Sequence, residues 1–166
     1  AGNYAIWAHR FWRHRDFDAQ LAPTSGSMGY GLPAAIAAAL RRPDREVICF
    51  AGDGCLQMTL QELGTAAQTG ARLIVLVADN RSYGTIRMHQ ERAYPGRVSA
   101  TDLVNPDFAA LARAYGLHAE TVRETADFAA ALARARRAEG AALIHLLTDV
   151  ERITPAATLA TLRARA

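Results

Sequence analysis

The sequence predicts an α/β fold: an open parallel sheet with helices on both of its faces. Two observations lead to this prediction. Segments of helical character alternate with short apolar segments along the chain, an order typical of parallel sheets. The two clearest strand segments, residues 47–50 and 73–77, are apolar throughout, as expected for strands that are covered on both faces.

Proline and glycine mark the ends of the elements expected in the first half of the chain. Pro33 falls in the first turn of a helix, where its missing N–H costs nothing, and Gly70 is a suitable C-terminal cap. The expected elements are, in order, a helix at 4–14, a loop at 23–31, a helix through 40, a turn at 41–45, a strand at 47–50 and a helix from about 59 to 70.

The second half continues the same alternation. The expected elements are a strand at 73–77, a loop rich in Gly and Pro, a helix at about 107–115, a strand at 118–122, a helix at about 126–138, a strand at 143–147 and a helical tail opened by Pro155. Within the loop, residues 91–105 are a candidate for a cover over the site. No repeat or linker interrupts the pattern, so residues 1–166 are expected to form a single domain.

The composition is that of an ordinary globular domain. Of the 166 residues, 51% are hydrophobic and 21% are charged, and the longest apolar runs are far too short to span a bilayer. No signal peptide is visible, and two cysteines, Cys49 and Cys55, suit neither a disulfide framework nor a zinc site. A cytoplasmic protein is therefore expected. The chain begins with Ala and reads as helix from residue 4, which suggests a piece of something longer.

The net charge of +3 raises the question of nucleic-acid binding. The excess lies mainly in arginines on the predicted helices at 4–14 and 126–138 and in the tail. A solvated or interface face explains these arginines more simply, so no nucleic-acid partner is expected.

Polar residues follow two neighbouring predicted strands. Gly52-Asp53-Gly54 comes after the first strand, and Asp79-Asn80 comes after the second. Ligands of open parallel sheets bind at the carboxyl ends of the strands, where both groups would meet. Carboxylate and amide oxygens suit Mg²⁺, and glycines with a helix N-terminus suit an anion, so the pattern predicts a magnesium-bound diphosphate. Gly-Asp-Gly alone is equally typical of a plain strand-ending turn.

Other motifs favour simpler interpretations. The glycines between Gly26 and Gly31 have the wrong order for a dinucleotide fingerprint, and no convincing strand precedes them. His9 and His14 would point to different faces of a helix and would not converge on one metal ion. Cys55 is interpreted as a small residue beside phosphate, although a reactive thiol is the alternative.

The spacing of the two polar groups resembles the thiamine-diphosphate-binding motif, which begins with Gly-Asp-Gly and ends in Asn. The stretch GDGCLQMTLQELGTAAQTGARLIVLVADN fits from end to end, with Asn80 27 positions after Asp53. SGSMGYGLPAAIAAAL upstream, and YGTIRMHQ and ALIHLLTD downstream, resemble the branch that contains acetolactate synthase and benzoylformate decarboxylase. The resemblance covers nearly the whole chain and implies the thiamine-diphosphate-binding fold.

The resemblance implies a role for each matching residue near the metal and the diphosphate. Asp53, the side chain of Asn80 and the backbone carbonyl of Ser82 would bind Mg²⁺. The residues that would line the diphosphate are Gly52, through its close backbone, Gly54 and Cys55, through their N–H groups, and Tyr83 and Gly84, on the phosphate side.

Two further residues would act on the other end of the cofactor. Met28 lies 25 residues before Asp53, where the family places the bulky apolar residue that forces the V-shaped cofactor conformation. The Gly26 carbonyl would accept a hydrogen bond from the 4′-amino group, and the Met28 N–H would bind the pyrimidine ring. Asn3 lies where relatives carry a Gly-Gln segment near the diphosphate, but this match is loose.

The resemblance also implies an activity and partners. The family decarboxylates small 2-oxo acids or joins them to a second carbonyl, and the glutamate that activates the cofactor sits on a pyrimidine-binding domain, usually of a neighbouring subunit. No glutamate here matches that motif, so the chain is expected to be inactive alone and to belong to a homo-oligomeric enzyme. His89 stands where biosynthetic acetolactate synthases carry tryptophan, which favours a less specialised carboligase or decarboxylase. A non-catalytic oligomerisation or regulatory module, and a different phosphate binder, are the alternatives.

Overall fold

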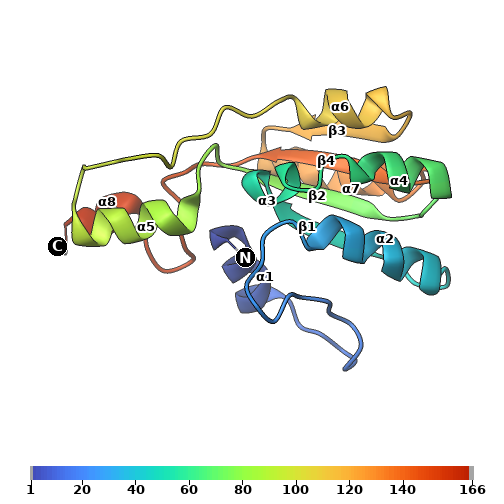
Figure 1. The fold of residues 1–166 in the computed structure, drawn as a ribbon, viewed down its shortest axis with the longest axis horizontal. Helices are drawn as coiled ribbons and strands as arrows, with labels where there is room; N and C mark the ends of the chain where they lie inside the picture. The colour runs from blue at the N-terminus through green and yellow to red at the C-terminus, as the bar shows by residue number, and fades with distance from the viewer. Residues whose placement is uncertain (1, 165–166) are drawn as a thin grey trace.

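A four-stranded, all-parallel sheet forms the centre of the protein (Figure 1). The computed structural model describes residues 2–164. The strand order is β1-β2-β4-β3. The strands are β1 (Ile48–Gly52), β2 (Ile74–Asp79), β3 (His118–Val122) and β4 (Ala142–Leu147). The α/β fold with a parallel sheet is confirmed, and each predicted strand overlaps an observed one.

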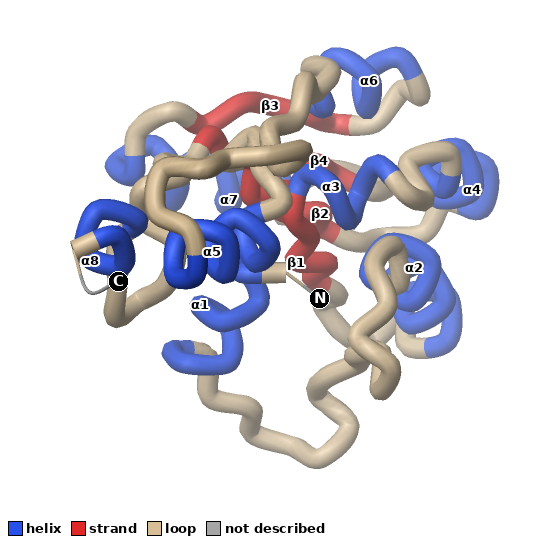
Figure 2. Tube along the Cα trace, turned by 60° about the vertical axis from the view of Figure 1, so that its left-hand side comes forward, coloured by secondary structure: helices blue, strands red, loops and turns tan. Residues whose placement is uncertain are grey.

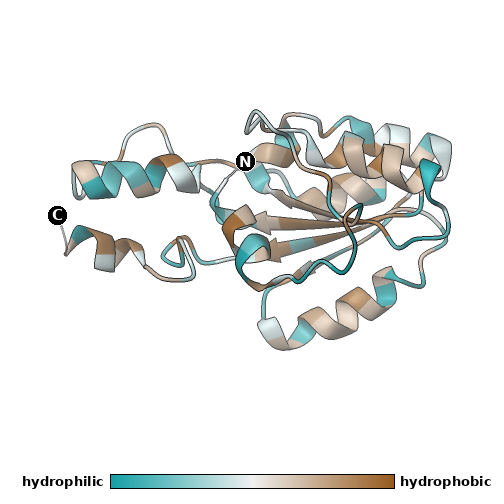
Figure 3. Ribbon diagram, turned by 90° about the horizontal axis from the view of Figure 1, so that it is seen from below, coloured by the Kyte–Doolittle hydropathy of each residue, from teal (hydrophilic) through white to brown (hydrophobic). Residues whose placement is uncertain are grey.

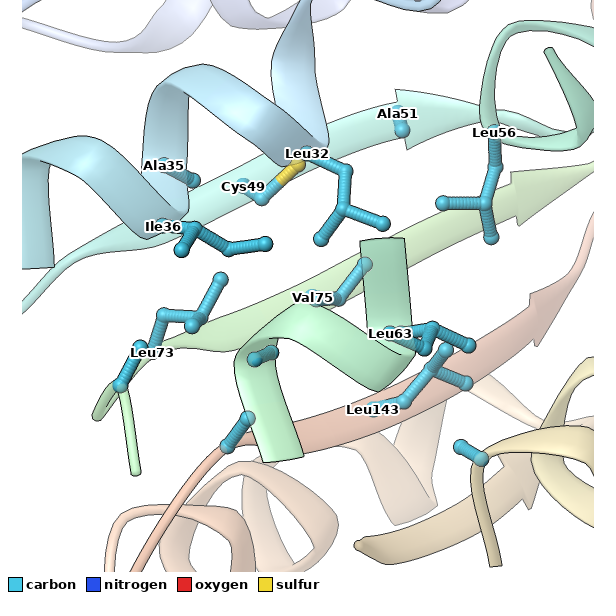
Figure 4. Packing of buried hydrophobic residues seen from close by; sticks show 14 of the residues in the cluster. Leu32, Ala35, Ile36, Cys49, Ala51, Leu56, Leu63, Leu73, Val75 and Leu143 are labelled. Carbon is cyan, nitrogen blue, oxygen red and sulfur yellow. The ribbon is translucent and has the colours of Figure 1, made fainter. Parts of the chain in front are cut away.

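Helices cover both faces of the sheet. On one face, the buried cluster contains apolar residues of α2 (Gly31–Arg41), α4 (Glu62–Thr69) and α6 (Phe108–Ala114) packed against Val75 and Leu143 (Figure 4). On the other face, α7 (Phe128–Ala135) packs against β2 and β4, and Tyr4 of α1 (Asn3–Phe11) meets Phe50 of β1 edge-on. Successive side chains of a strand point to opposite faces, so a strand between two helical layers is apolar at nearly every position.

The predicted helix at 59–70 is observed as α4, and a short helix that the sequence did not predict precedes it. α3 (Asp53–Gln57) begins directly after β1, and α4 follows after a short turn. Gly70 adopts φ 63° and ends α4 as predicted, because a residue without Cβ tolerates the left-handed conformation. The first turn of α3 carries the buried Asp53.

A helix that the sequence did not predict, α5 (Gly84–Ala93), occupies part of the segment expected to be a loop. Its sequence is polar and has no apolar stripe, and in the described structure only Met88 supplies a buried apolar side chain. The start of the candidate loop at 91–105 is corrected accordingly, since residues 91–93 belong to α5. Figure 2 shows the remaining connection between α5 and α6 as one of two long loops, the other joining α1 to α2.

The C-terminal helix α8 (Leu159–Arg163) packs beside α5, and both project beyond the carboxyl ends of the strands (Figure 3). Pro155 does not open this helix. A turn closed between Thr154 and Ala157 comes first, and Thr158 then caps α8 through a reciprocal capping box with Thr161. Within residues 2–164, no helix has the length and apolar character needed to cross a membrane.

A buried carboxylate, Glu91, joins α5 to α8. The side chain is 1% exposed and accepts hydrogen bonds from Arg163 Nε at 2.8 Å and Nη2 at 2.7 Å, and from Arg87 Nε at 2.9 Å. The Gly96 N–H donates to the same carboxylate at 2.9 Å. Arg163 and the other donors hold the pKa of Glu91 well below its ordinary value against the opposing effect of burial.

We expect Glu91→Gln to lower the free energy of opening of α5 by about 3 kcal/mol, because it leaves two partly exposed arginine groups without their buried counter-charge. Native-state hydrogen exchange of the α5 amides at pH 7 measures this change. Since the pKa is depressed in the folded chain, the stabilisation is present above the ordinary value of 4.5 and is lost as the pH falls below it. Glu120→Gln is the control, because Glu120 pairs with Arg134 at an exposed surface. Equal effects of the two substitutions would contradict the prediction.

Candidate functional site

The parallel pairing of β1 with β2 brings two buried carboxylates to one edge of the sheet. Gly52 is in register with Ala78, so Asp53 and Asp79 are the next residues along two adjacent strands. Asp53 is the first residue of α3 and is 4% exposed, and Asp79 ends β2 and is 3% exposed. The arrowheads of Figure 3 point to this edge. The predicted meeting of the two polar groups at the carboxyl ends of the strands is therefore observed.

Asn105, from the loop before α6, bridges the two carboxylates. Its Nδ2 lies 2.8 Å from Asp53 Oδ2 and 2.6 Å from Asp79 Oδ1. Its Oδ1 accepts a hydrogen bond from Gln57 Nε2 at 2.7 Å. The amide thus supplies hydrogen atoms to both acids and is itself held in orientation from α3. The candidate covering loop reaches the site through this residue.

The two carboxyls differ in acidity. Burial raises the pKa of Asp53 to about 6, the neighbouring Asp79 adds to the rise, and the N–H groups of Asn105 and Gly54 oppose it. Burial acts on Asp79 in the same direction, but hydrogen bonds from His145, the Arg81 N–H and Asn105 outweigh it and hold the pKa of Asp79 below its ordinary value. On acidification, Asp53 therefore takes up the first proton.

The segment after β2 forms a tight turn built on side-chain oxygens. Asp79 Oδ1 accepts the Arg81 N–H at 3.0 Å, and Asn80 Oδ1 accepts the Ser82 N–H at 3.0 Å. Arg81 has φ 55°, a conformation that residues with a Cβ seldom adopt. The turn carries Asn80 and Ser82, the two predicted ligands that follow β2.

Ser82 is fixed by an isolated antiparallel bridge with Asp102. The hydrogen bonds of this bridge run from the Tyr83 N–H to the Thr101 carbonyl and from the Leu103 N–H to the Arg81 carbonyl, both at 2.8 Å. They do not use the Ser82 carbonyl. Within residues 2–164, the buried Ser82 Oγ and Thr101 Oγ1 have no hydrogen-bond partner.

Glycines let side chains pack directly on the backbone here. A Cβ on Gly52 would meet the ring of Tyr4 at 2.6 Å, and a Cβ on Gly54 would meet the ring of Tyr83 at 2.7 Å. A Cβ on Gly84, at the start of α5, would collide with the side chain of Asn3. The structure thus brings together the two segments that carry the predicted diphosphate residues, 52–55 and 83–84, and places Asn3, the loose match, beside Gly84.

Two predicted residues of this group have other surroundings that bear on their roles. The Gly54 N–H, a predicted diphosphate donor, donates to Asp53 Oδ1 at 2.8 Å, so it would have to exchange that partner. Cys55 is buried in α3 and is 7% exposed. Its N–H, not its thiol, is the group assigned by the resemblance.

Gly26 and Met28 lie apart from the acids, in the loop before α2. Gly26 has φ 67° and is exposed, and Met28 is half-buried. The loop is anchored at Gly29, whose carbonyl accepts a hydrogen bond from Thr59 Oγ1 at 2.9 Å. This contact joins the Met28 loop to the turn between α3 and α4, on the side of the site next to β1.

Sequence reasoning missed Asn105, His145 and Gln57. His145 Nε2 lies 2.8 Å from Asp79 Oδ2, and its ring meets Phe108 edge-on at 5.2 Å. A signal existed for His145, since it is the only polar side chain in the otherwise apolar strand β4. Asn105 and Gln57 gave none, because surface-type residues in a loop and in a short helix are ordinary.

The ligands available to a metal ion are carboxylate, amide and backbone oxygens. Within residues 2–164, no three His, Cys, Asp or Glu side chains are grouped so as to hold a metal ion. A site here would therefore need the Asn80 amide and the Ser82 carbonyl beside Asp53, a set of hard oxygens that fits Mg²⁺ with phosphate and water completing the shell.

Two surface hollows lie away from the two acids. One is lined by residues such as His118, Arg134 and Gly140, and another by residues such as Glu46 and Arg72. Both lie where the strands begin, at the opposite edge of the sheet from Asp53. Since ligands of open parallel sheets bind at the carboxyl ends, we assign the functional site to the acidic edge.

Comparison with known proteins identifies relatives of the whole domain. The model of the thiamine pyrophosphate enzyme family for the C-terminal TPP binding domain matches residues 1–146. The chain is 34% identical over 157 residues to the acetolactate synthase isozyme 2 large subunit of Escherichia coli (strain K12), covering 93% of this chain and 29% of that protein. It is 41% identical over 118 residues to the acetolactate synthase large subunit of Parasynechococcus marenigrum (strain WH8102), covering 70% and 19%.

Solved structures show the same likeness in three dimensions. The thiamine diphosphate-dependent 4-hydroxybenzoylformate decarboxylase of Rhodococcus jostii RHA1 superposes with a TM-score of 0.78 at 32% identity, over 89% of this chain and 29% of that chain. Benzoylformate decarboxylase from Polynucleobacter necessarius gives a TM-score of 0.70 at 29% identity, over 76% of this chain and 25% of that one. The chain thus spans less than a third of the length of each of these relatives.

We expect the Asp53 carboxyl of the metal-free chain to titrate at about pH 6, because burial disfavours its charge. Carbon-13 NMR of the aspartate carboxyl carbons measures the midpoint, and Asp53→Asn assigns the resonance. The folded chain binds this proton more tightly than the unfolded chain, so the stability contribution of Asp53 falls as the pH rises from the ordinary value of 3.8 to about 6. A midpoint near 3.8 would contradict the prediction.

Proposed function

Because the chain belongs to the family of thiamine pyrophosphate enzymes and carries their C-terminal TPP binding domain, we propose that it holds the diphosphate of thiamine diphosphate through Mg²⁺. The family membership confirms the resemblance found in the sequence. The observation that carries the magnesium proposal is the placement of Asp53 and the Asn80–Ser82 turn at the ends of two adjacent strands.

The proposed metal ligands are Asp53, the Asn80 side chain and the Ser82 carbonyl. The Asp53 carboxylate is already held in place: Oδ1 accepts a hydrogen bond from the Gly54 N–H, and Oδ2 accepts one from Asn105 Nδ2. Ser82 is locked in the bridge with Asp102, which leaves its carbonyl outside the ladder hydrogen bonds. A ligand set that is rigid before binding loses little conformational entropy on binding.

The proposed diphosphate site is lined by the glycines and the N–H groups at the starts of α3 and α5. Gly52, Gly54, Cys55, Tyr83 and Gly84 would surround the anion. Tyr83 lies against Gly54, so the two segments already touch. Unpaired N–H groups in the first turn of a helix favour negative charge, which supports an anion at this place.

Gly26 and Met28 would hold the other end of the cofactor. We propose that the Gly26 carbonyl and the Met28 N–H bind the pyrimidine ring and that the Met28 side chain supports the bent cofactor. Thiamine diphosphate, when bound, supplies the carbanion-stabilising chemistry of the reaction. The contribution of this chain is to bind and orient it.

For the whole enzyme we propose decarboxylation or carboligation of a small 2-oxo acid in a cytoplasmic homo-oligomer. The relatives compared above are acetolactate synthase large subunits, a 4-hydroxybenzoylformate decarboxylase and a benzoylformate decarboxylase. His89, exposed on α5, in place of the tryptophan of biosynthetic acetolactate synthases, supports a less specialised carboligase or decarboxylase. We further propose that this chain is inactive until a pyrimidine-binding domain supplies the activating glutamate.

We expect Asp53→Ala to abolish magnesium-dependent binding of thiamine diphosphate without unfolding the domain. Calorimetric titration of the cofactor, first with Mg²⁺ and then with chelator, measures the loss, and circular dichroism reports the fold. Asp102→Ala is the matched control, because Asp102 lies nearby with its side chain 79% exposed. Retained binding in Asp53→Ala would remove the metal assignment. If the wild-type chain itself does not bind, the titration is repeated with a pyrimidine-binding domain added.

We expect Met28→Ala to reduce turnover of the complete enzyme more than its affinity for thiamine diphosphate, because the side chain orients the cofactor and does not hold its diphosphate. Steady-state kinetics and calorimetry on the same preparations measure the two effects. Met58→Ala is the control, since Met58 touches the same loop near Gly29 and is 52% exposed. Equal losses of turnover and affinity in Met28→Ala would count against the orienting role.

A further inference from the structure

A histidine buried in the central sheet is connected to the proposed metal site through Asp79. His145 lies in the middle of β4, is 5% exposed, and stacks edge-on against Phe108, which is fully buried. Its neighbours in the strand are apolar, so an apolar side chain would fit the layer at no polar cost. A buried polar ring needs a hydrogen-bond partner, and Asp79 Oδ2, 2.8 Å from His145 Nε2, is that partner.

The hydrogen bonds of Asp79 fix it from several sides. Oδ2 faces His145, while Oδ1 accepts from the Arg81 N–H at 3.0 Å and from Asn105 Nδ2 at 2.6 Å. Asp79 is not a proposed metal ligand. Its carboxylate instead closes the turn that contains Arg81, whose positive φ of 55° costs free energy unless the surroundings hold it. This turn orients Asn80 and Ser82.

Asn105 extends the same network to the other strand. Because its Nδ2 donates to both Asp79 and Asp53, the chain of contacts from His145 reaches the proposed ligands on both sides. The network is His145–Asp79–Asn105–Asp53, and every contact in it is between 2.6 and 2.8 Å.

We infer that His145 is a positioning residue that acts through Asp79 to set the Asn80–Ser82 turn, and that Asn105 carries the same constraint to Asp53. The metal part of this inference rests on the proposed function, whereas the part on the turn does not. A carboxylate can only accept, so Nε2 must carry the hydrogen in this contact. Nδ1 has no hydrogen-bond partner within residues 2–164, and its nearest acidic oxygen, Asp107 Oδ1, is 4.0 Å away.

Two substitutions of His145 separate its hydrogen bond to Asp79 from the space that its ring fills. Gln can place an amide N–H near the position of Nε2, while Leu fills similar space without a donor. His145→Gln should therefore preserve the turn and His145→Leu should release it. Loss of a group that orients a metal ligand typically weakens metal binding by about 10- to 100-fold.

The first measurement is amide hydrogen exchange by NMR on the chain without ligand. In His145→Leu, the Arg81 and Ser82 amides should exchange roughly fivefold faster or more, as expected for the loss of one hydrogen bond. The β2 amides from Val75 to Val77 should be unchanged, and His145→Gln should restore the slow rates. Unchanged rates at Arg81 and Ser82, or equal acceleration throughout β2, would overturn the inference. His118→Leu, an exposed histidine on β3, is the control.

The second measurement is Mn²⁺ binding in the presence of thiamine diphosphate, followed by electron paramagnetic resonance. His145→Leu and Asn105→Ala should each bind Mn²⁺ about 10- to 100-fold more weakly than wild type, with His145→Gln close to wild type. Wild-type affinity in both variants would overturn the metal part. Absence of Mn²⁺ binding in the wild type, also with a pyrimidine-binding domain added, would overturn the proposed function and the metal part together. The exchange rates would still decide the role of His145 in the turn.

Discussion

The register between β1 and β2 is the constraint on which the site depends. Parallel pairing of Gly52 with Ala78 makes Asp53 and Asp79 neighbours, although 26 positions separate them in the chain. A slip of one residue would turn the side chains of one strand to the other face and separate the acids. The register is in turn maintained by the helical layers, because Cys49 and Ala51 of β1 and Val75 and Val77 of β2 must face the same cluster.

Burial of two acids at one edge is costly, and the surrounding groups show how the cost is reduced. Asp79 is fully occupied by donors from β4, its own turn and the loop before α6. Asp53 has fewer donors, and burial raises its pKa to about 6. An acid that is desolvated and only partly satisfied gains most from a cation, whereas a fully satisfied acid gains least. This difference supports Asp53 as ligand and Asp79 as support.

The lobe formed by α5 and α8 illustrates a second use of a buried charge. A small apolar cluster around Met88 and Ile153 would be weak alone, and Glu91 of α5 joins the two helices through Arg163 of α8. Because α5 begins at Gly84, directly after Tyr83, the contacts that hold α5 in place also hold the edge of the site. The polar helix α5 therefore supplies a fixed neighbour to the proposed diphosphate residues Tyr83 and Gly84.

The sequence by itself determined the fold class, the strands and the two polar groups at their ends, because each is a local pattern: apolar runs, glycine caps and the Gly-Asp-Gly to Asn spacing. It did not determine α5, since this polar helix is stabilised by the contact between Glu91 and the distant Arg163. It also did not reveal Asn105 or the role of His145. These residues meet Asp79 from 26 and 66 positions away, and only the tertiary structure decides which distant side chains share a buried carboxylate.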